Sequence, residues 1–190
     1  MNIILASESK NRQAVLKMVG IDFEIIPSQV DESLVKEANP VKRAEQIAFL
    51  KAQKVAENNQ GLIVAADTFT FRRRKILEKP QSLKEAAKML RWLSGKAVYN
   101  VTALCVINTQ SKEVFKNSAL TRVWFRKLSR GEIKDCVVTE PVLTWAAAYS
   151  PINSKTAKFI KKTEGSFTGL AFGLPLEQLI PILQKYKLIL

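Results

Sequence analysis

The 190-residue sequence contains no histidine. Ser-His-Asp catalysis, Cys-His catalysis and His-ligated zinc sites all need an imidazole, so an enzyme with this sequence must use a carboxylate, a lysine or a metal-bound water as its base. The two cysteines, Cys105 and Cys136, are too few for a disulfide framework. No apolar run approaches the roughly 20 residues of a membrane helix, and no signal peptide is recognisable. We therefore expect a cytoplasmic protein without a membrane partner.

The composition is that of a globular protein, with 47% hydrophobic and 25% charged residues. A chain of this length can bury a sizeable core and is most simply one domain, residues 1–190, with room for two lobes. Lysine and arginine exceed aspartate and glutamate by 30 to 17, which gives a formal charge of +13. This charge attracts polyanions, and both nucleic acid and nucleotide phosphate are candidates.

Short apolar strands alternate with amphipathic helices along the chain, as is typical of an α/β fold. Strands are expected at 3–6, 23–26, 62–68, 98–107 and 114–125, with a hairpin whose charged tip is 72–75. Helices are expected up to Gly20 and over 40–58, 82–93, 129–138, 156–162 and 176–186. Capping boxes are predicted at Ser82 with Glu85 and at Ser129 with Glu132.

The run from Leu62 to Ala66 consists of small or branched apolar residues and stops at Asp67 and Thr68. Such a run suits a strand that is buried on both faces. In open α/β sheets, ligands bind beyond the carboxyl ends of the strands, so a functional carboxylate is expected at Asp67. The same aspartate could instead only cap a turn.

The loop after the first strand, residues 7–12, offers Ser7, Ser9, Arg12 and the N–H groups of a helix N-terminus. These groups suit an anion, and the arginine can grip a phosphate with two hydrogen bonds. An ordinary serine cap beside a solvated arginine explains the same residues. Neither a Walker loop nor a Gly-x-Gly-x-x-Gly motif is present, so P-loop and Rossmann chemistry are not predicted.

Further charged residues are Asp31, Glu32, Lys51 and Lys79. Each one alone is most simply a surface charge. Together with Asp67 they would hold a divalent metal and a triphosphate around one sheet edge.

Several short segments occur in the order and at the spacing of one known family. They are residues 5–12, 30–33, Lys51-Ala52, Ala66-Asp67-Thr68, Lys79-Pro80, 93–95, Phe159-Ile160, 164–166 and 173–176. Through these segments the sequence resembles the Maf family of nucleoside triphosphate pyrophosphatases over nearly its whole length.

The resemblance implies an elongated mixed β-sheet flanked by helices, with two lobes and a cleft between them, and a homodimer. It implies hydrolysis of a nucleoside triphosphate to the monophosphate and pyrophosphate with Mg²⁺ or Mn²⁺. Asp67 would then be the proton acceptor and would hold the metal with Glu32. The residues expected to bind substrate are Ser7, Ser9, Arg12, Lys51 and Lys79.

Three positions align with those that separate pyrimidine-type from 7-methyl-GTP-type members of the family: Asn11, Thr68 and Asn153. Thr68 resembles the dTTP/UTP group, whereas the pattern of residues 165–183 resembles the other group. The preferred base therefore stays open at this stage.

The sequence departs from the family pattern at Lys10, which replaces a proline, and at Glu78 and Ala103, which replace glycines. One alternative is thus a Maf-like protein that has lost its activity. Another is a basic nucleic-acid-binding protein without enzymatic activity, since the hairpin tip at 72–75 could contact phosphates. Trp92 and Trp124 fall in core-like patterns, so no stacking platform is predicted and nucleic acid is not the expected partner.

Overall fold

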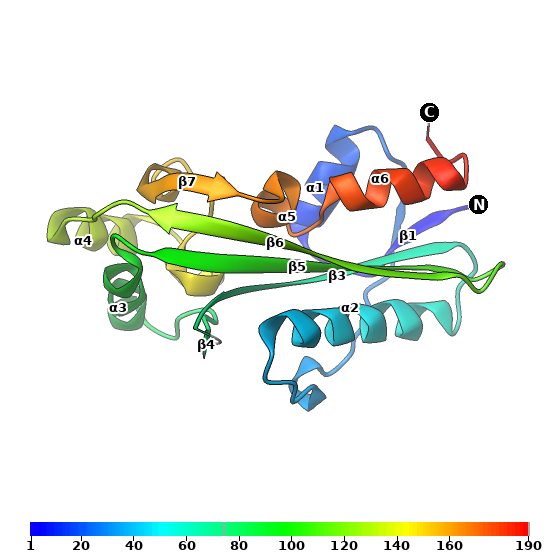
Figure 1. The fold of residues 1–190 in the computed structure, drawn as a ribbon, viewed down its shortest axis with the longest axis horizontal. Helices are drawn as coiled ribbons and strands as arrows, with labels where there is room; N and C mark the ends of the chain where they lie inside the picture. The colour runs from blue at the N-terminus through cyan, green and yellow to red at the C-terminus, as the bar shows by residue number, and fades with distance from the viewer. Residues whose placement is uncertain (74, 190) are drawn as a thin grey trace. The chain divides into compact units, whose positions relative to one another are not determined.

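The computed structural model describes residues 1–73 and 75–189, and in this part of the chain a mixed seven-stranded sheet is flanked by helices (Figure 1). The strand order is β2-β1-β3-β5-β6-β7, and β4 pairs with β3. The strands are β1 (Ile3–Leu5), β2 (Glu24–Ile25), β3 (Leu62–Arg72), β4 (Lys75–Ile76), β5 (Ala97–Asn108), β6 (Val114–Phe125) and β7 (Ile160–Glu164). The predicted α/β class is confirmed.

Six α-helices and four short 3₁₀ segments lie in the described residues. The helices are α1 (Lys10–Met18), α2 (Pro40–Ala56), α3 (Leu83–Leu93), α4 (Arg130–Thr139), α5 (Phe167–Phe172) and α6 (Leu176–Lys185). The 3₁₀ segments are η1 (Glu32–Leu34), η2 (Val142–Thr144), η3 (Ala146–Ala148) and η4 (Thr156–Phe159). None of the helices described is long and apolar enough to cross a membrane.

The chain divides into two compact units. Unit 1 comprises residues 1–68, 101–119 and the segment from Thr168 onward, and unit 2 comprises residues 69–100 and 120–167. Strands β3, β5 and β6 therefore contribute residues to both units. That residues 1–190 act as a single domain stays a prediction.

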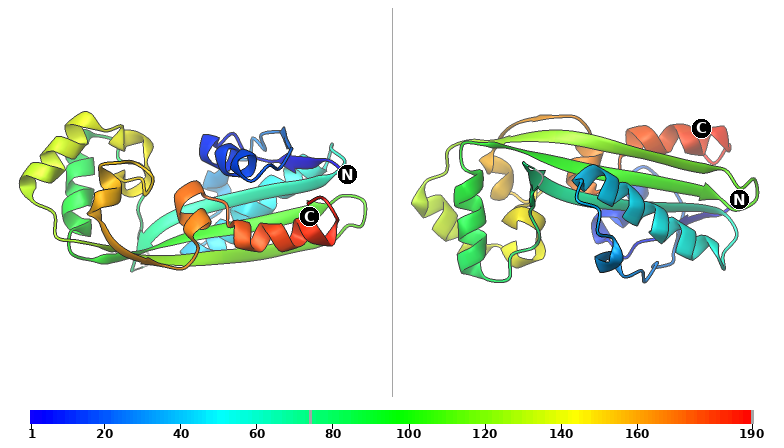
Figure 2. Two further views of the ribbon diagram at one scale, coloured as in Figure 1. Left: turned by 90° about the horizontal axis from the view of Figure 1, so that it is seen from above. Right: turned by 60° about the horizontal axis from the view of Figure 1, so that its bottom comes forward.

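Unit 1 begins with a β-α-β motif in which β1 pairs in parallel with β2 and with β3. Leu62, Val64 and Ala66 on β3 face one core, which they share with residues of α1 and α6. Ile63 and Ala65 must point to the opposite face, because successive side chains of a strand alternate. Helix α2 lies on that second face (Figures 1 and 2). The sheet of unit 1 is thus covered on both faces, and burial of each large aliphatic side chain contributes about 1.5–3 kcal/mol.

Local sequence signals explain where the helices begin. The Asn39 side chain accepts hydrogen bonds from the N–H groups of Val41 and Lys42, and Pro40 occupies the first turn of α2. The capping box predicted at Ser129 is present in full at the start of α4. At Ser82 it is only half present. Ser82 accepts from the N–H of Glu85, but the Glu85 carboxylate accepts from the N–H of Gln81.

Unit 2 contains the hairpin of β3 and β4, in which Phe71 pairs with Ile76 and Arg72 with Lys75. Arg73 at its tip has a φ of 49°, and Arg74 lies outside the described residues. Strand β7 pairs antiparallel with β6 at the sheet edge. Helices α3 and α4 lie together beside these strands (Figure 2).

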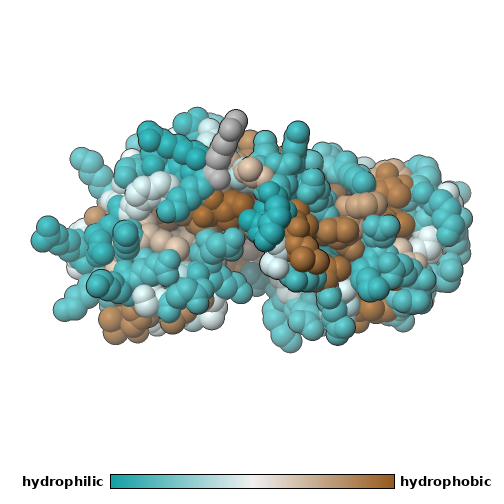
Figure 3. Space-filling model, turned by 90° about the horizontal axis from the view of Figure 1, so that it is seen from below, coloured by the Kyte–Doolittle hydropathy of each residue, from teal (hydrophilic) through white to brown (hydrophobic). Residues whose placement is uncertain are grey.

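One predicted element was wrong and one helix was missed. Residues 156–162 are not one helix, because the chain forms η4 and then the edge strand β7. The residues of β7 are mostly exposed and carry no apolar period, so their conformation follows from pairing with β6. Helix α5 was missed because its six residues are too few for a periodic signal. The face drawn in Figure 3 is largely hydrophilic, with smaller hydrophobic patches between the polar residues.

Candidate functional site

Asp67 lies inside a strand and not at its end, so the prediction that the strand stops there was wrong. Strand β1 ends at Leu5, which pairs with Val64 of β3, and the N–H of Ala6 donates to the Val64 carbonyl. Beyond this point β1 departs while β3 continues to Arg72. Asp67 therefore sits in β3 just beyond the carboxyl end of its parallel neighbour, where α/β sheets bind ligands.

Lys51 joins two carboxylates in unit 1. Its Nζ atom lies 2.8 Å from Oδ1 of Asp67 and 2.6 Å from Oε1 of Glu32. Helix α2 supplies the lysine, β3 the aspartate and η1 the glutamate. We call Glu32, Lys51 and Asp67 the carboxylate–lysine cluster. The sequence analysis predicted all three residues, and the structure brings them together.

Two members of this cluster are buried. Lys51 is 8% exposed and Asp67 6%, whereas the side chain of Glu32 is 48% exposed. Burial raises the pKa of Asp67, and the positive charges of Lys51 and Arg12 only partly oppose this. Oδ2 of Asp67 is buried and accepts no hydrogen bond from the described residues. An unpartnered buried carboxylate oxygen is costly, so this atom is where a ligand, a water or a metal ion would be accepted.

Arg12, in the first turn of α1, makes hydrogen bonds to two separate segments of the chain. Nε of Arg12 donates to the Gly173 carbonyl at 2.8 Å, and Nη1 donates to Oγ of Ser7 at 2.9 Å. Ser9 caps α1 by accepting from the N–H of Arg12. Burial lowers the pKa of Arg12, and the charges of Asp67 and Glu32 act in the opposite direction, so the guanidinium lies within electrostatic reach of the carboxylate–lysine cluster.

Thr68 points to the other face of β3 from Asp67, because adjacent residues of a strand alternate. Its Oγ1 atom lies 3.2 Å from Oγ1 of Thr102, which donates to the Gly169 carbonyl at 2.9 Å. Gly173 has a φ of +70°, and a Cβ atom there would lie 3.2 Å from Oγ1 of Thr68. The side chain of Asp67 and that of Thr68, the candidate specificity residue, therefore lie on opposite faces of β3.

Thr102 was missed by the sequence analysis. A buried threonine within the apolar run of β5 is the signal that could have pointed to it. Asn11, which was predicted, lies exposed on α1.

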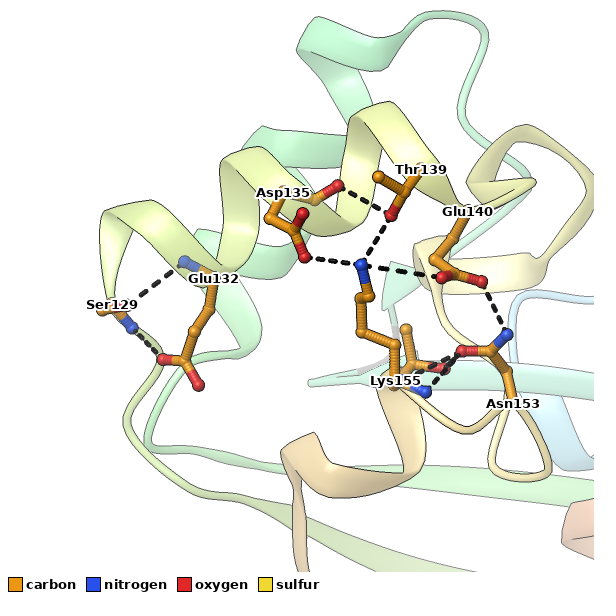
Figure 4. A network of polar contacts seen from close by, with 8 residues as sticks. Ser129, Glu132, Asp135, Thr139, Glu140, Asn153 and Lys155 are labelled. Atoms are coloured by element: carbon orange, nitrogen blue, oxygen red, sulfur yellow. Dashed lines mark hydrogen bonds and ion pairs between the residues drawn. The ribbon is translucent and has the colours of Figure 1, made fainter.

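The other two predicted residues, Lys79 and Asn153, belong to unit 2. Lys79 is exposed. Asn153 is held at both ends of its amide: Nδ2 donates to Glu140 at 2.7 Å, and Oδ1 accepts from the N–H groups of Lys155 and Thr156 (Figure 4). This amide organises the loop before η4. A role of Lys79 and Asn153 in substrate binding stays a prediction.

The described residues contain no group of three or more His, Cys, Asp and Glu side chains close enough to hold a metal by themselves. Magnesium ions in nucleotide sites are commonly bound through one or two carboxylates plus substrate phosphates. Glu32 and Asp67, which meet at Lys51 and leave Oδ2 of Asp67 unpartnered, fit that mode of binding.

The family model of the Maf-like proteins matches residues 2–186. The chain belongs to the Maf family. Over 96% of each chain, this Maf-family protein is 37% identical to a protein of Treponema denticola named dTTP/UTP pyrophosphatase. It is 36% identical to a protein of the same name from Aquifex aeolicus, over 100% of this chain and 97% of that one.

A solved structure with a similar fold is that of a HAM1 protein from Coxiella burnetii. Its TM-score is 0.54 at 16% identity, and the match covers 97% of this Maf-family chain and 99% of the other. The Ham1 protein of Staphylococcus aureus matches with a TM-score of 0.50 at 15% identity, over 98% of both chains. At this identity the likeness concerns the fold alone.

Proposed function

We propose that this Maf-family protein hydrolyses a nucleoside triphosphate between the α- and β-phosphates and releases the monophosphate and pyrophosphate. Its relatives of 36–37% identity are named dTTP/UTP pyrophosphatases. We therefore propose dTTP and UTP as substrates, in line with Thr68. The observation that carries the proposal is the buried Asp67, which has one oxygen on Lys51 and the other unpartnered.

In this proposal Oδ2 of Asp67 accepts the proton of the attacking water. A general base works best when its pKa is close to the working pH, and burial moves the pKa of Asp67 in that direction. Lys51 and Arg12 supply positive charge where the phosphates gain negative charge in the transition state. Ser7 orients Arg12 through its hydroxyl group. Ser9, as the cap of α1, places N–H groups at the helix N-terminus for a phosphate oxygen.

Glu32 and Asp67 are the residues that would hold Mg²⁺ or Mn²⁺. The bound ion would supply positive charge to the phosphate oxygens. Lys51 now occupies the space between the two carboxylates, so its ammonium group must share them with the ion or turn to the substrate.

The test is pyrophosphate release from dTTP, UTP, dCTP, GTP and 7-methyl-GTP. We expect turnover of dTTP and UTP, and we expect Asp67→Asn to lower kcat at least about 10²–10⁴-fold, because the proton acceptor is lost together with one carboxylate of the proposed metal site. The matched control is Asp31→Asn, which removes the same charge from the exposed aspartate that caps η1 and that, unlike Glu32, forms no salt bridge with Lys51 among the described residues. Full activity of Asp67→Asn contradicts the proposal. Absence of turnover with every nucleotide supports the alternative that activity has been lost.

The metal requirement is tested with the same assay. EDTA should abolish turnover, and Glu32→Gln should raise the Mg²⁺ concentration needed for half-maximal rate, while Asp31→Asn should not. Binding of Mn²⁺, followed by its electron paramagnetic resonance signal, provides a readout apart from activity. Equal Mn²⁺ affinity of Glu32→Gln and the unchanged protein would remove Glu32 from the metal site.

A further inference from the structure

One face of the sheet in unit 2 is open. Val98 and Val123 are fully buried, whereas Tyr99, Arg122 and Trp124, which lie on the opposite face of β5 and β6, are partly or fully exposed. Helices α3 and α4 lie together on one side of these strands (Figure 2). Burial alternates over residues 97–100 of β5 and 118–125 of β6, so the described residues cover only one face in this part of the sheet.

The open face carries a row of aromatic rings and cations from four strands. Phe71 of β3 stacks on Tyr99 of β5 with ring centroids 5.7 Å apart. The guanidinium of Arg122 lies 5.8 Å from the Tyr99 ring and 4.5 Å from the Trp124 ring. Nζ of Lys162, on β7, lies 5.1 Å from the same tryptophan. We call these five residues the aromatic–cation ladder.

The ladder changes the expectation for Trp124, which the sequence pattern placed in the core. Trp124 is partly exposed because it lies on the open face of β6, and Lys162 of β7 pairs opposite it. Partly exposed aromatic rings interleaved with arginine and lysine, as in this ladder, are features that bind single-stranded nucleic acids. Bases stack on rings or on guanidinium planes, and cations contact the phosphates. The formal charge of +13 favours such a polyanion.

A second copy of this chain fits the face less well. An isologous dimer brings the same patch of both copies together, so Arg122 and Lys162 would meet the same cations of the partner copy. Glu164, which pairs with Lys162, could offset only part of this repulsion.

We propose that the aromatic–cation ladder of unit 2 binds single-stranded nucleic acid. The bases stack on Tyr99, Trp124 and the Arg122 guanidinium, and Lys162 contacts the phosphate backbone. The ladder contains no residue of the carboxylate–lysine cluster, and the proposal that it binds nucleic acid does not depend on the proposed pyrophosphatase activity.

Fluorescence anisotropy with labelled oligo-dT and oligo-U of about 12 nucleotides tests the proposal. The oligonucleotides carry a 5′-hydroxyl group, so that a triphosphate site cannot hold them. We expect Trp124→Ala to weaken binding about tenfold because one stacked base is lost. Arg122→Gln with Lys162→Gln should reduce the slope of log affinity against log salt by about 0.7, because the phosphate contact of Lys162 is lost.

The matched control is Lys84→Gln with Arg91→Gln, which removes two exposed cations from α3. This control should leave the salt slope nearly unchanged. Tyr99→Leu provides a second stacking variant should Trp124→Ala not fold, and thermal unfolding checks each protein.

Three results would overturn the proposal. The first is equal affinity for duplex and single strands, and the second is an equal loss of salt slope in the α3 control, because both indicate diffuse charge attraction. The third is a dimer in sedimentation that the ladder variants dissociate while oligonucleotide binding stays unchanged, which assigns the face to contact between copies. None of these outcomes bears on pyrophosphate release.

Discussion

The two units place their ion pairs in different surroundings. In unit 1, Lys51 and Asp67 are 8% and 6% exposed, and the pKa of Asp67 is raised by burial. In unit 2, Lys155 contacts Asp135 at 2.5 Å and Thr139 at 2.7 Å at the surface (Figure 4). The comparison shows that burial, and not the presence of a salt bridge, raises the pKa of a carboxylate here.

The ion pairs at the surface lie at helix ends or link neighbouring elements. Lys155 lies at the C-terminal end of α4, where a cation interacts favourably with the helix dipole. Arg126 pairs with Glu132, which caps the start of the same helix. Unit 1 also has such a pair at its surface, between Glu113 and Lys185. Among the ion pairs of the described residues, only that of Lys51 and Asp67 joins two buried side chains and leaves a carboxylate oxygen unpartnered.

The largest effect is expected from Lys51→Met. Removal of the lysine leaves Asp67 buried without its counter-charge, so the free energy of unfolding should fall by about 3 kcal/mol in urea titrations. The matched control is Lys54→Met on the same helix, which breaks an exposed pair with Glu57 and should cost about 0.2–0.5 kcal/mol. Equal losses in the two variants would contradict the contrast between buried and exposed pairs.

A smaller loss is expected from Lys155→Met in unit 2. Its partners Asp135 and Thr139 regain water when the lysine is removed, so the urea midpoint should shift less than in Lys51→Met. Lys155→Arg keeps the positive charge, so its urea midpoint should lie close to that of the unchanged protein. A shift as large as that of Lys51→Met would show that the network of Figure 4 behaves like a buried one.

The smallest effect is expected from Glu113→Gln, and it should depend on pH. Hydrogen bonds from Lys185, Tyr186 and Ser111 lower the pKa of Glu113 to about 2. A carboxylate whose pKa is lower in the folded state stabilises the fold above its unfolded pKa, and this contribution is lost as the pH falls towards 2. The urea midpoint of Glu113→Gln should therefore lie below that of the unchanged protein at pH 6 and meet it near pH 2.

The variant Glu132→Gln gives the corresponding measurement for unit 2. A hydrogen bond from Arg126 lowers the pKa of Glu132 to about 2 as well. Both exposed carboxylates should show the same convergence at low pH. A difference that stays constant between pH 6 and pH 2 would mean that the ion pairs are not the cause.

The sequence predicted elements well where a repeating pattern was long enough. Strands β5 and β6 and helices α2, α3 and α6 were predicted from their residue patterns, and their positions are confirmed within a few residues. Helix α4 was predicted from its capping box at Ser129. Strand β7 and helix α5 were missed because they are short and their residues carry little periodic signal. Their conformation depends on neighbours that are distant in the sequence.

In the candidate site, too, the sequence predicted some features and only the structure showed others. Residues that could carry the chemistry, among them Asp67, Lys51 and Glu32, were predicted from residue type, position and family resemblance. Their proximity, the partnership of Arg12 with Gly173 and the contact of Thr68 with Thr102 required the structure.

The sequence by itself determined that any base in this protein is not a histidine, and it determined which carboxylates and cations are available. Only the tertiary structure decided that Asp67 is the carboxylate with a raised pKa and a free oxygen. The reason is physical. The burial and the electrostatic surroundings of Asp67 arise because β1 ends beside β3 and because α2 covers the face of β3 on which Asp67 lies. These elements are distant in the sequence, so no local stretch contains the arrangement.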